Sequence, residues 1–410
     1  MHSVPLLIIG GGIAGASLAC SLAERGAGAG VGLVDVDLWG KYSSSELNGG
    51  GVRCTFAEPV NVRVSLASTH YYIQHAKKFD FRQRGYLWMY DEELWDEAHQ
   101  FLPVVRNFGL PVEQLTQSQL KEKFPILSDV SDLAGATFTP FDGRLSPHRL
   151  RMHYLDRAQQ KGVQILDRWQ VVAIEGAAGE FLVRMQRVKP RRIRKALESP
   201  TESTAPQDPA DELIVRAERI VNAAGPWAPR LAKLYGRTLP VTALPRQVYL
   251  IRHEQVNLEP LPFFLDYPQD IYFRHFERDR ENYTLVSWSD PEEKEGIHFA
   301  HHGLAYYNDK VKPFLVKRIA QLEEGEVTGG WVGHYELSPD KGAIVGPVPE
   351  RDGIFNYSGL SAHGVMQSRG LAEALAHFLL HNSWPPELNL DELTEARFSR
   401  TSTLRERMYV

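Results

Sequence analysis

Apolar residues near the start of the chain follow two spacings in turn. Residues 4–9 (VPLLII) form a short apolar run of the kind found in buried strands, and a cluster of glycines follows them. Small and apolar residues then recur at helical spacing in residues 15–26, and a second buried run occupies residues 31–37 (VGLVDVD). This pattern predicts a strand, a tight turn, a helix and a second strand. Because the crossover of such a unit is right-handed, the two strands begin a parallel sheet.

Two later stretches return to the same alternation. Residues 142–166 predict a helix in which Pro147 suits the first turn, and a strand pair follows within residues 169–188. Residues 217–236 again predict a strand, a turn of small residues and a helix. A glycine-rich loop and a closing helix occupy residues 357–380. These stretches extend the same parallel-sheet domain.

The intervening segments have a different pattern. Residues 62–135 mix helical stretches with loops, and residues 241–254, 271–279 and 282–288 are rich in β-branched and aromatic residues, as in an antiparallel sheet. We therefore predict an α/β fold (α+β overall), in which a Rossmann-type domain with a parallel sheet is interleaved with an antiparallel-sheet domain. The ranges that we expect are 1–80, 140–235 and 330–410 for the first domain, and 81–139 and 236–329 for the second.

Residues 187–212 interrupt the first domain with a basic stretch that is followed by Ser, Thr, Pro and acidic residues. Such a composition is typical of a charged insertion, either a solvated hairpin or a flexible loop. We expect no role for it in the chemistry.

Composition narrows the classes of partner. The chain has 410 residues, 43% of them hydrophobic, and a formal net charge of -5, so a basic surface for nucleic acid is not expected. Two cysteines, Cys20 and Cys54, form neither a disulfide framework nor a C-x-x-C pair. No apolar run approaches the roughly 18 residues that a membrane span needs, and Met1 leads directly into a strand without a basic presequence. We expect a cytoplasmic protein that acts on small molecules.

The glycine cluster has the spacing of a dinucleotide site. Gly10, Gly12 and Gly15 fit G-x-G-x-x-G directly after a strand and at the start of a helix. These glycines permit a tight turn, close approach of a pyrophosphate and close helix–strand packing, while the helix N-terminus attracts the phosphates. Asp35 ends the second strand 20 positions after Gly15, where a carboxylate can accept from a ribose hydroxyl, and Asp37 is the alternative acceptor.

Two further segments favour a flavin over a nicotinamide. Residues 43–53 (SSSELNGGGVR) supply serines and glycines that suit phosphate and ring contacts. Residues 221–227 (VNAAGPW) place small side chains at a strand end, where a flat ring can lie against the backbone. Both suit a cofactor that is buried and permanently held, so we predict FAD.

These motifs resemble the D-amino-acid oxidase and sarcosine oxidase family of FAD-dependent oxidoreductases along nearly the whole chain. The pattern is most similar to the branch of sarcosine oxidase beta-subunits and amino-acid dehydrogenases. The residues that carry the resemblance are GGGIAG (10–15), SSSELNGGGVR (43–53), DGRLSPHRL (142–150), IVNAAGPWAPRLA (220–232), PRQV (245–248), IYFR (271–274), WVGHYELSPDKGAIVG (331–346) and GLSAHGVMQSRG (359–370).

The resemblance implies an FAD domain, a substrate domain and a set of cofactor contacts. Residues 364–366, at the start of the closing helix, would direct backbone N–H groups at the flavin ring. The implied cofactor-binding residues are Gly10, Gly12, Ile13, Ala14, Gly15, Asp35, Val36, Ser43, Ser44, Ser45, Gly50, Gly51, Val171, Val172, Ala223, Ala224, Gly225, Trp227, Gly359, Leu360, His363, Gly364, Val365 and Met366.

Four residues are the implied catalytic set. Arg274 is our first choice for a bidentate clamp on a substrate carboxylate, because the guanidinium fork matches that geometry. Arg53 is expected near the flavin face or the carboxylate, and Tyr335 corresponds to an aromatic residue of the substrate pocket. His363 would lie close to the flavin ring.

Departures from the family pattern change two expectations. Gly333 occupies the position of a cysteine that is bonded to the flavin in monomeric sarcosine oxidases, so the resemblance implies non-covalent FAD. Val286 occupies the position of a lysine that promotes reaction with oxygen there, so a dehydrogenase with another electron acceptor becomes comparable to an oxidase.

Two other interpretations have little support. The sequence GLSAH resembles a hydrolase elbow, but His363 replaces the second glycine and the expected strand is absent from the pattern. His298, His301 and His302 suggest a metal, yet no nearby carboxylate or cysteine completes a ligand set, and we predict no metal site.

The predicted function is FAD-dependent oxidation of the C–N bond of an amino acid, imino acid or N-methyl amino acid, by hydride transfer to flavin N5. Two alternatives stay open at this point. One is an FAD-dependent 2-hydroxy-acid dehydrogenase, for which His363 would be the base. The other is a non-catalytic, flavin-bound assembly or interaction protein.

Overall fold

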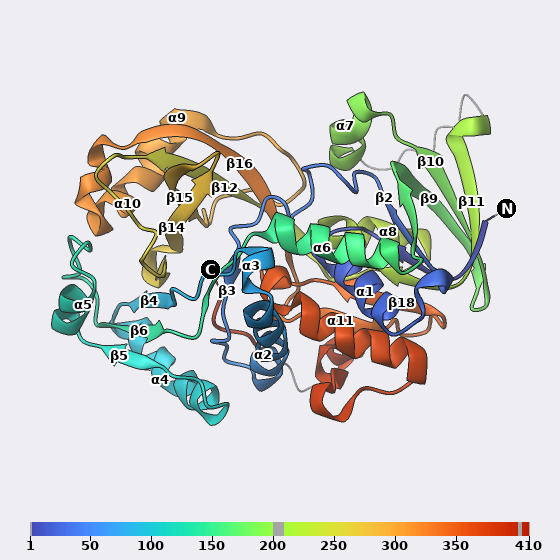
Figure 1. Cartoon of the computed structure of the whole chain (residues 1–410), viewed down its shortest axis with the longest axis horizontal. Coiled ribbons are helices and arrows are strands. Elements are labelled where there is room, and N and C mark those ends of the chain that lie inside the picture. Colours follow the sequence, from blue (N-terminus) through green and yellow to red (C-terminus); the bar gives the residue numbers. More distant parts are fainter. Residues whose placement is uncertain (1, 200–208, 401–403, 410) are drawn as a thin grey trace.

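The computed structural model describes residues 2–199, 209–400 and 404–409, which build two large sheets (Figure 1). Figure 1 shows one sheet and its helices near the N-terminus and the other on the opposite side, with the last residues between them. Both sheets draw strands from distant parts of the sequence, so the chain passes repeatedly from one to the other.

The first sheet has a parallel centre. In the described residues it has eight strands, and β11, β1, β2 and β8 run parallel, as does β18 beside β11. Antiparallel strands flank this centre. The strands are β1 (His2–Ile9), β2 (Val31–Asp35), β8 (Gln164–Asp167), β9 (Trp169–Ala177), β10 (Glu180–Arg187), β11 (Glu212–Asn222), β17 (Ile344–Pro347) and β18 (Ile354–Ser358).

Strand β1 is buried on both faces, as its continuous apolar run predicts. Leu6 and Ile8 face helices α1 (Ile13–Glu24), α6 (Pro147–Gln160) and α11 (Gly364–His381), which pack on one another. Leu7 and Ile9 face the other way, toward α8 (Ala228–Leu234) and the hairpin of β9 and β10. The parallel sheet therefore lies between two apolar layers.

The second sheet is largely antiparallel and also has eight strands among the described residues. One pair departs from the predicted pattern, because β13 runs parallel to β4. The strands are β4 (Tyr86–Tyr90), β5 (Glu113–Leu115), β6 (Gly135–Thr139), β12 (Thr242–Arg252), β13 (Phe263–Asp266), β14 (Ile271–Arg278), β15 (Glu281–Trp288) and β16 (Glu326–Leu337). The interleaved α/β fold with two sheets is thus confirmed.

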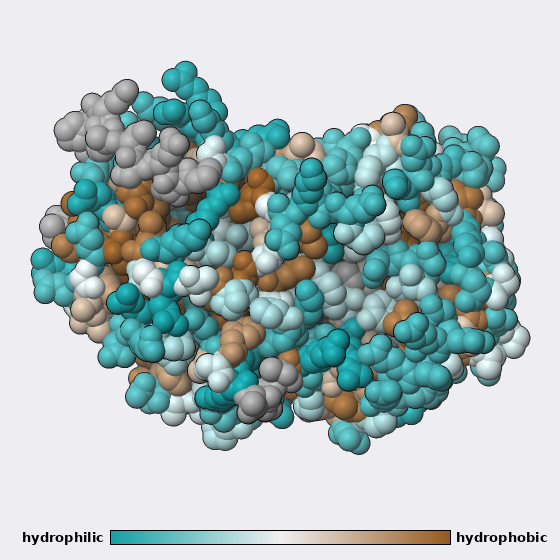
Figure 2. All heavy atoms as spheres, turned by 180° about the vertical axis from the view of Figure 1, so that it is seen from behind, coloured by the Kyte–Doolittle hydropathy of each residue, from teal (hydrophilic) through white to brown (hydrophobic). Residues whose placement is uncertain are grey.

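Shorter elements connect the sheets. A two-stranded ribbon joins β3 (Gly51–Val52) to β7 (Gly143–Arg144). The remaining helices are α2 (Pro59–Gln74), α3 (Ala76–Phe79), α4 (Glu92–Asn107), α5 (Gln117–Lys123), α7 (Ile193–Glu198), α9 (Gly303–Tyr306) and α10 (Lys312–Arg318). Figure 2 shows the opposite face of the molecule, where hydrophilic residues cover most of the surface and hydrophobic ones reach it in small groups.

Helix α7 lies in residues 187–212, which connect the antiparallel strands β10 and β11. In the described part of this segment, residues 190–192 form a 3-10 turn and α7 follows. Ile193 and Leu197 of α7 pack against Val188, and Trp227 and Phe299 border this cluster. Residues 200–208 lie outside the described part of the chain.

Candidate functional site

The glycine turn after β1 is packed too closely for side chains at two positions. Gly10 has φ +109°, and a Cβ atom there would lie 2.2 Å from the carbonyl oxygen of Ala223. A Cβ atom on Gly15 would lie 1.8 Å from the carbonyl oxygen of Gly10. The turn therefore needs glycine for its own conformation and for the approach of helix α1 to the strand.

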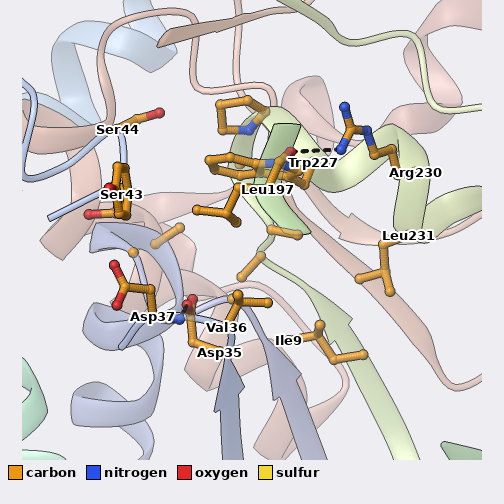
Figure 3. Close-up of a pocket in the computed structure, with 18 of the residues that line it drawn as sticks. Ile9, Asp35, Val36, Asp37, Ser43, Ser44, Leu197, Trp227, Arg230 and Leu231 are labelled. Carbon is orange, nitrogen blue, oxygen red and sulfur yellow. Dashed lines mark hydrogen bonds between the residues drawn. The ribbon is translucent and has the colours of Figure 1, made fainter. Parts of the chain in front are cut away.

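A cavity of about 1090 Å³, counted with the solvent at its mouth, lies at the carboxyl ends of β1, β2 and β11. Figure 3 shows Ile9 and Leu231 on one side of it and Asp37, Ser43 and Ser44 on the other. Predicted cofactor residues that line it are Gly10, Gly12, Ile13, Ala14, Asp35, Val36, Ser43, Ser44, Ser45, Val171, Ala223, Ala224, Gly225, Trp227 and Leu360.

Asp35 and Asp37 both line this cavity, so both remain candidates for a ribose hydroxyl. The Asp35 carboxylate accepts from the N–H groups of Gly11 (2.5 Å) and Asp37 (2.7 Å), which fixes it at the end of β2. Burial raises the pKa of Asp35. Burial, and then the Asp35 charge, raises the pKa of Asp37.

Helix α7 forms a wall of the same cavity, although the sequence analysis gave its segment no role. Ala196 and Leu197 line the cavity. The Leu197 carbonyl oxygen accepts from Trp227 Nε1 and from Arg230 Nη1, each at 2.8 Å, and Figure 3 shows the bond to Arg230. The described part of the insertion thus contributes directly to the candidate cofactor site.

Arg151 of α6 is a site residue that the sequence analysis missed. Its buried guanidinium donates from Nη1 to the carbonyl oxygens of Leu38 (2.6 Å) and Gly11 (3.3 Å), and from Nε to Glu46 (2.7 Å). It therefore ties the glycine turn to the segment after β2. Its partners lie more than 100 positions away, and no local spacing signals them.

A second and a third cavity, of about 560 and 480 Å³, extend the first toward the antiparallel sheet. The first and second share the walls Ile13, Ser44, Ser45, Glu336 and Leu360. The second and third share Asn48, Gly49, Tyr272, Tyr335 and Ala362. The three cavities form one elongated space between the two sheets.

The loop before α11 borders the second and third cavities. Gly359, Ser361 and Ala362 all have positive φ, so the chain turns sharply into the helix. No side chain caps the N-terminus of α11, and Gly364 and Val365 line the second cavity. An uncapped first turn offers N–H groups and a partial positive charge to a ligand.

Arg53 and His363 lie together in the wall of the third cavity. Arg53 Nη2 is 3.2 Å from His363 Nε2 and also donates to the carbonyl oxygen of Met408 (2.5 Å). The guanidinium lies 4.1 Å from the ring centre of Phe56 and 5.0 Å from that of Trp88. Burial lowers the pKa of Arg53, and no carboxylate in the described residues forms an ion pair with it.

The structure does not bring Arg274 into any of these three cavities. Its Nε donates to the carbonyl oxygen of Gly49 (2.5 Å) and its Nη1 to that of His275. Burial, and then the positive charge of Arg144, lowers the pKa of Arg274 to about 9. Arg274 thus supports the backbone beneath the site, while Arg53 faces the cavity.

Arg246, which the sequence analysis did not select, lines the second cavity. It lies directly across from Gly333 in the pairing of β12 with β16, and its guanidinium is 4.9 Å from the ring centre of Tyr335. Its Nε is buried and has no partner in the described part of the chain. The motif PRQV contained this residue, but the motif alone did not indicate which face of the strand it occupies.

The third cavity has aromatic walls. Tyr86 and Phe263 stack with ring centres 4.5 Å apart, and Trp88 and Tyr272 lie beside them. Tyr335 separates this cavity from the second, and burial raises its pKa well above the usual value. Gly51 and Met366, both predicted cofactor residues, also line the third cavity.

Four predicted cofactor residues line none of the three cavities: Gly15, Gly50, Val172 and Gly359. Gly50 has φ +72°, and a Cβ atom on it would lie 2.3 Å from the carbonyl oxygen of Leu145. Val286 packs with Phe273 and Tyr249 in a cluster separate from the one that contains Tyr86 and Tyr272. The side chain of Val286 therefore does not reach the candidate site.

The histidines of residues 298–302 bind protein groups. His302 Nε2 lies 3.0 Å from Glu293, and the N–H of His298 donates to His334 Nε2 at 3.2 Å. Among the described residues, no group of three or more His, Cys, Asp or Glu side chains is arranged to hold a metal. Nor does this part of the chain contain a helix of the length and apolar character that crossing a membrane requires.

Comparison with known proteins identifies relatives along the whole chain. FAD-dependent oxidoreductase domain-containing protein 1 of Xenopus laevis is 26% identical over 99% of this chain and 84% of its own length. Mitochondrial sarcosine dehydrogenase of Mus musculus is 22% identical over 76% of this chain, but only 32% of that protein is matched. The crystal structure of L-proline dehydrogenase from P. horikoshii has the same fold, with a TM-score of 0.81, 21% identity, and coverage of 98% and 99% of the two chains.

A family model agrees with these similarities and with the glycine turn at the strand ends. The model described as "DAO: FAD dependent oxidoreductase" matches residues 6–378, which include all three cavities and both sheets except the first residues of β1. The chain belongs to the DAO family of FAD-dependent oxidoreductases.

Proposed function

We propose that the protein oxidises the C–N bond of an amino acid, imino acid or N-methyl amino acid. The observation that carries this proposal is the position of Arg53, a buried cation near Asp142 and Glu406 that forms no ion pair with a carboxylate in the described residues, in an aromatic cavity that joins the cofactor space. Two relatives are named for such substrates, sarcosine dehydrogenase and L-proline dehydrogenase. A 2-amino acid would supply the missing carboxylate.

FAD fits the elongated space in shape and chemistry. The glycine turn leaves room for a pyrophosphate beside the N-terminus of α1, and the end of β2 presents carboxylates for a ribose. Ser44 Oγ, Arg246 Nε and His363 Nδ1 are buried polar atoms without partners in the described chain, as expected where a polar ligand supplies them. Gly333 offers no side-chain nucleophile, so we propose that the cofactor is held without a covalent bond.

The protein's part in the reaction is to orient the substrate and keep it dry. Bound FAD would supply the acceptor for the hydride that leaves the substrate carbon. Arg53 would hold the carboxylate, and Tyr86, Trp88 and Phe263 would exclude water from the third cavity. A neutral amine that has lost a hydride is an iminium ion, and water then hydrolyses it to the carbonyl compound and an ammonium ion.

His363 supports an amine substrate over a 2-hydroxy acid. Burial, and then the Arg53 charge, lowers the pKa of His363 well below its usual value, which makes it a weak base for a hydroxyl proton. A neutral amine needs no such base. None of the described residues that line the three cavities is a lysine, which supports an electron acceptor other than oxygen.

Anaerobic mixing would test the function directly. The holoenzyme is mixed with amino acids, N-methyl amino acids, cyclic imino acids and 2-hydroxy acids, and the flavin absorbance near 450 nm is followed. We expect loss of this band with at least one amine substrate, and faster recovery with an artificial electron acceptor than with air. Bleaching by 2-hydroxy acids alone would overturn the proposal.

A further inference from the structure

Glu336 is a buried carboxyl group at the junction of the first two cavities. It lies near the end of β16, is 9% exposed and lines both cavities. Its Oε2 accepts from the N–H of Gly359 at 3.0 Å, and a Cβ atom on Gly225 would lie 3.8 Å from the same oxygen. The carboxyl is therefore held between the two backbone turns that border the cofactor space.

No cation in the described part of the chain neutralises this carboxyl. Among residues 2–199, 209–400 and 404–409, no lysine, arginine or histidine nitrogen forms an ion pair with it. An ionised carboxylate that is buried without a cation is costly, whereas the neutral acid is not. A carboxylic acid also has an O–H donor, which a carboxylate lacks.

We propose that Glu336 acts as a protonated carboxylic acid that donates a hydrogen bond to the bound FAD. In this state the carboxyl accepts from the backbone N–H groups of Gly359 and Leu360, and its own proton is available to an acceptor of the cofactor. Burial raises the pKa of Glu336 to about 8, which agrees with a neutral group at pH 7. A hydrogen bond from Glu336 to the cofactor does not depend on the identity of the substrate.

Other titratable groups border the same space and could also contribute a pH dependence. Burial lowers the pKa of His334 to about 4, so this imidazole is neutral throughout the relevant range. Burial raises the pKa values of Tyr272, Tyr335 and Tyr357. The remaining groups that line the first two cavities are Asp35, Asp37, Tyr42, Arg230 and Arg246. A pH dependence of FAD affinity that arises from Glu336 must therefore disappear when Glu336 alone is replaced.

The pH dependence of FAD affinity follows from the proposal. FAD carries a negatively charged pyrophosphate, and ionisation of Glu336 removes a donor and adds a buried negative charge beside it. We expect the dissociation constant of the apoprotein for FAD to be constant below about pH 7. Above the pKa of Glu336 it should rise by up to about tenfold per pH unit, because only the protonated form binds well.

Fluorescence titration of apoprotein with FAD between pH 6 and 9.5 tests this expectation. Glu336→Gln keeps a donor and an acceptor but does not ionise, so its affinity should stay within about threefold of the wild-type value at pH 6.5 and lose the rise. His334→Gln is the matched control and should retain the rise. A flat wild-type profile, or an unchanged rise in Glu336→Gln, would overturn the proposal.

Proton uptake gives a second test that needs only the wild-type protein. Burial by the bound cofactor should favour the protonated acid further, so binding of FAD at pH 8 to 8.5 should take up protons, whereas binding at pH 6.5 should not. Calorimetry in buffers of different ionisation enthalpy measures the number of protons taken up when FAD binds. Absence of uptake at pH 8 to 8.5, or proton release, would contradict a protonated Glu336 in the complex.

Discussion

Arg53 Nη2 lies 3.2 Å from His363 Nε2, although the two residues are 310 positions apart. An arginine can only donate, so Nε2 of the imidazole accepts and Nδ1 carries the proton. Burial and the adjacent positive charge lower the pKa of His363, which keeps the ring neutral. The arginine therefore fixes both the orientation and the tautomer of a neutral imidazole beside the third cavity.

Replacement of His363 should affect the reaction more than the cofactor. His363→Ala removes a hydrogen-bond partner of Arg53, and a lost bond to a charged group costs about 1.5–3 kcal/mol, or roughly 10- to 150-fold. We expect flavin reduction by the amine substrate to slow by that factor, with little loss of FAD. Stopped-flow absorbance and flavin content measure the two effects.

Gly364→Val provides the contrast to His363→Ala. A Cβ atom at this position would lie 2.9 Å from Leu360 Cδ1 and 3.4 Å from Ile13 Cγ2, next to the second cavity. This variant should lose the cofactor itself. Equal and mild effects of both substitutions would count against the assigned positions of the loop and the helix start.

Two buried arginines should respond differently to substitution by lysine. Arg53→Lys keeps the charge but loses the planar fork, so we expect KM for the amino-acid substrate to rise by about tenfold or more. Arg274→Lys should leave KM within about threefold, because Arg274 donates to the backbone outside the three cavities. Steady-state kinetics with an artificial acceptor compares the variants. A larger KM effect at Arg274 would restore it as the carboxylate clamp.

The parts of the site that local geometry determines could be predicted from the sequence. Gly10, Gly12 and Asp35 line the first cavity because a glycine turn between two parallel strands has one geometry, which spacing reveals. Pro147 stands in the first turn of α6, as the helix pattern indicated, and the Ser146 side chain caps this turn. The interleaved fold followed from the return of the strand and helix pattern late in the chain.

The parts that depend on tertiary contacts could not be predicted. Period-two alternation places Tyr272 and Arg274 on one face of β14, but the position of the strand against Gly49 decides that only Tyr272 reaches the cavities. Arg151 acts through partners that are distant in sequence. Helix α7 becomes a cavity wall because Trp227 and Arg230 bind its last turn, which a charged composition does not indicate.

Substitution by alanine should weaken FAD binding at Gly12 but lower the stability of the apoprotein at Gly15. A Cβ atom on Gly12 would meet only Ser45 Oγ, at 3.4 Å, but would stand in the first cavity. A Cβ atom on Gly15 would lie 1.8 Å from a backbone oxygen. Gly12→Ala should fold and bind FAD at least about tenfold more weakly, whereas Gly15→Ala should lower the Tm of the apoprotein. Thermal unfolding without FAD, together with FAD titration, separates the two; a normal apoprotein Tm for Gly15→Ala would contradict the close packing.

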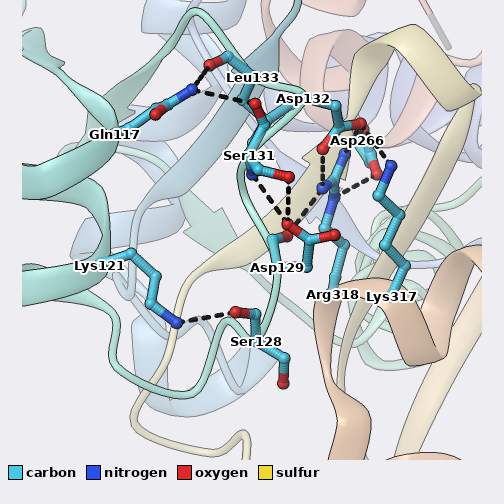
Figure 4. Close-up of polar contacts among 10 residues, drawn as sticks. All are labelled: Gln117, Lys121, Ser128, Asp129, Ser131, Asp132, Leu133, Asp266, Lys317 and Arg318. Carbon is cyan, nitrogen blue, oxygen red and sulfur yellow. Dashed lines mark hydrogen bonds and ion pairs between the residues drawn. The ribbon is translucent and has the colours of Figure 1, made fainter.

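Arg318 should matter for stability and not for the chemistry. Figure 4 shows its side chain between Asp132 and Asp266. The fully buried guanidinium donates to Asp266 (2.6 and 3.2 Å), to Asp132 (2.7 and 3.0 Å) and to the carbonyl oxygen of Asp129 (2.8 Å). Arg318→Met leaves the buried carboxylate of Asp266 without its cation, which should lower the free energy of unfolding by about 3–5 kcal/mol.

Lys317→Ala is the matched control for Arg318→Met. Lys317 binds the same Asp132 at 2.8 Å, but both side chains are about one-third exposed, so its loss should cost at most about 1 kcal/mol. Urea unfolding gives both values, and KM for substrate should be unchanged in each variant. Equal costs at the two positions would show that the buried network around Arg318 does not stabilise the fold as its geometry implies.

Asp142 should make the stability of the protein depend on pH between about 4 and 6. It is 1% exposed, and its carboxylate accepts from the N–H of Cys54 (2.8 Å) and from the hydroxyls of Thr55 (3.0 Å) and Thr139 (2.5 Å). Burial nevertheless raises the pKa of Asp142 from 3.8 to about 6, because these bonds and the charge of Arg53 only partly compensate for the lost water.

An acid whose pKa is higher in the folded state than in the unfolded state stabilises the fold when it is protonated. Its contribution is fully present below about pH 4 and is lost as the pH rises through about 6, and the full change is about 3 kcal/mol. Asp142→Asn cannot ionise and lacks this change. Other carboxylates titrate in the same range, so the relevant quantity is the difference in unfolding free energy between wild type and Asp142→Asn. Urea unfolding at pH 4, 5, 6 and 7 should show the unfolding free energy of the wild type rising by about 3 kcal/mol relative to that of the variant as the pH falls. A constant difference would mean that Asp142 is ionised in the fold at little cost.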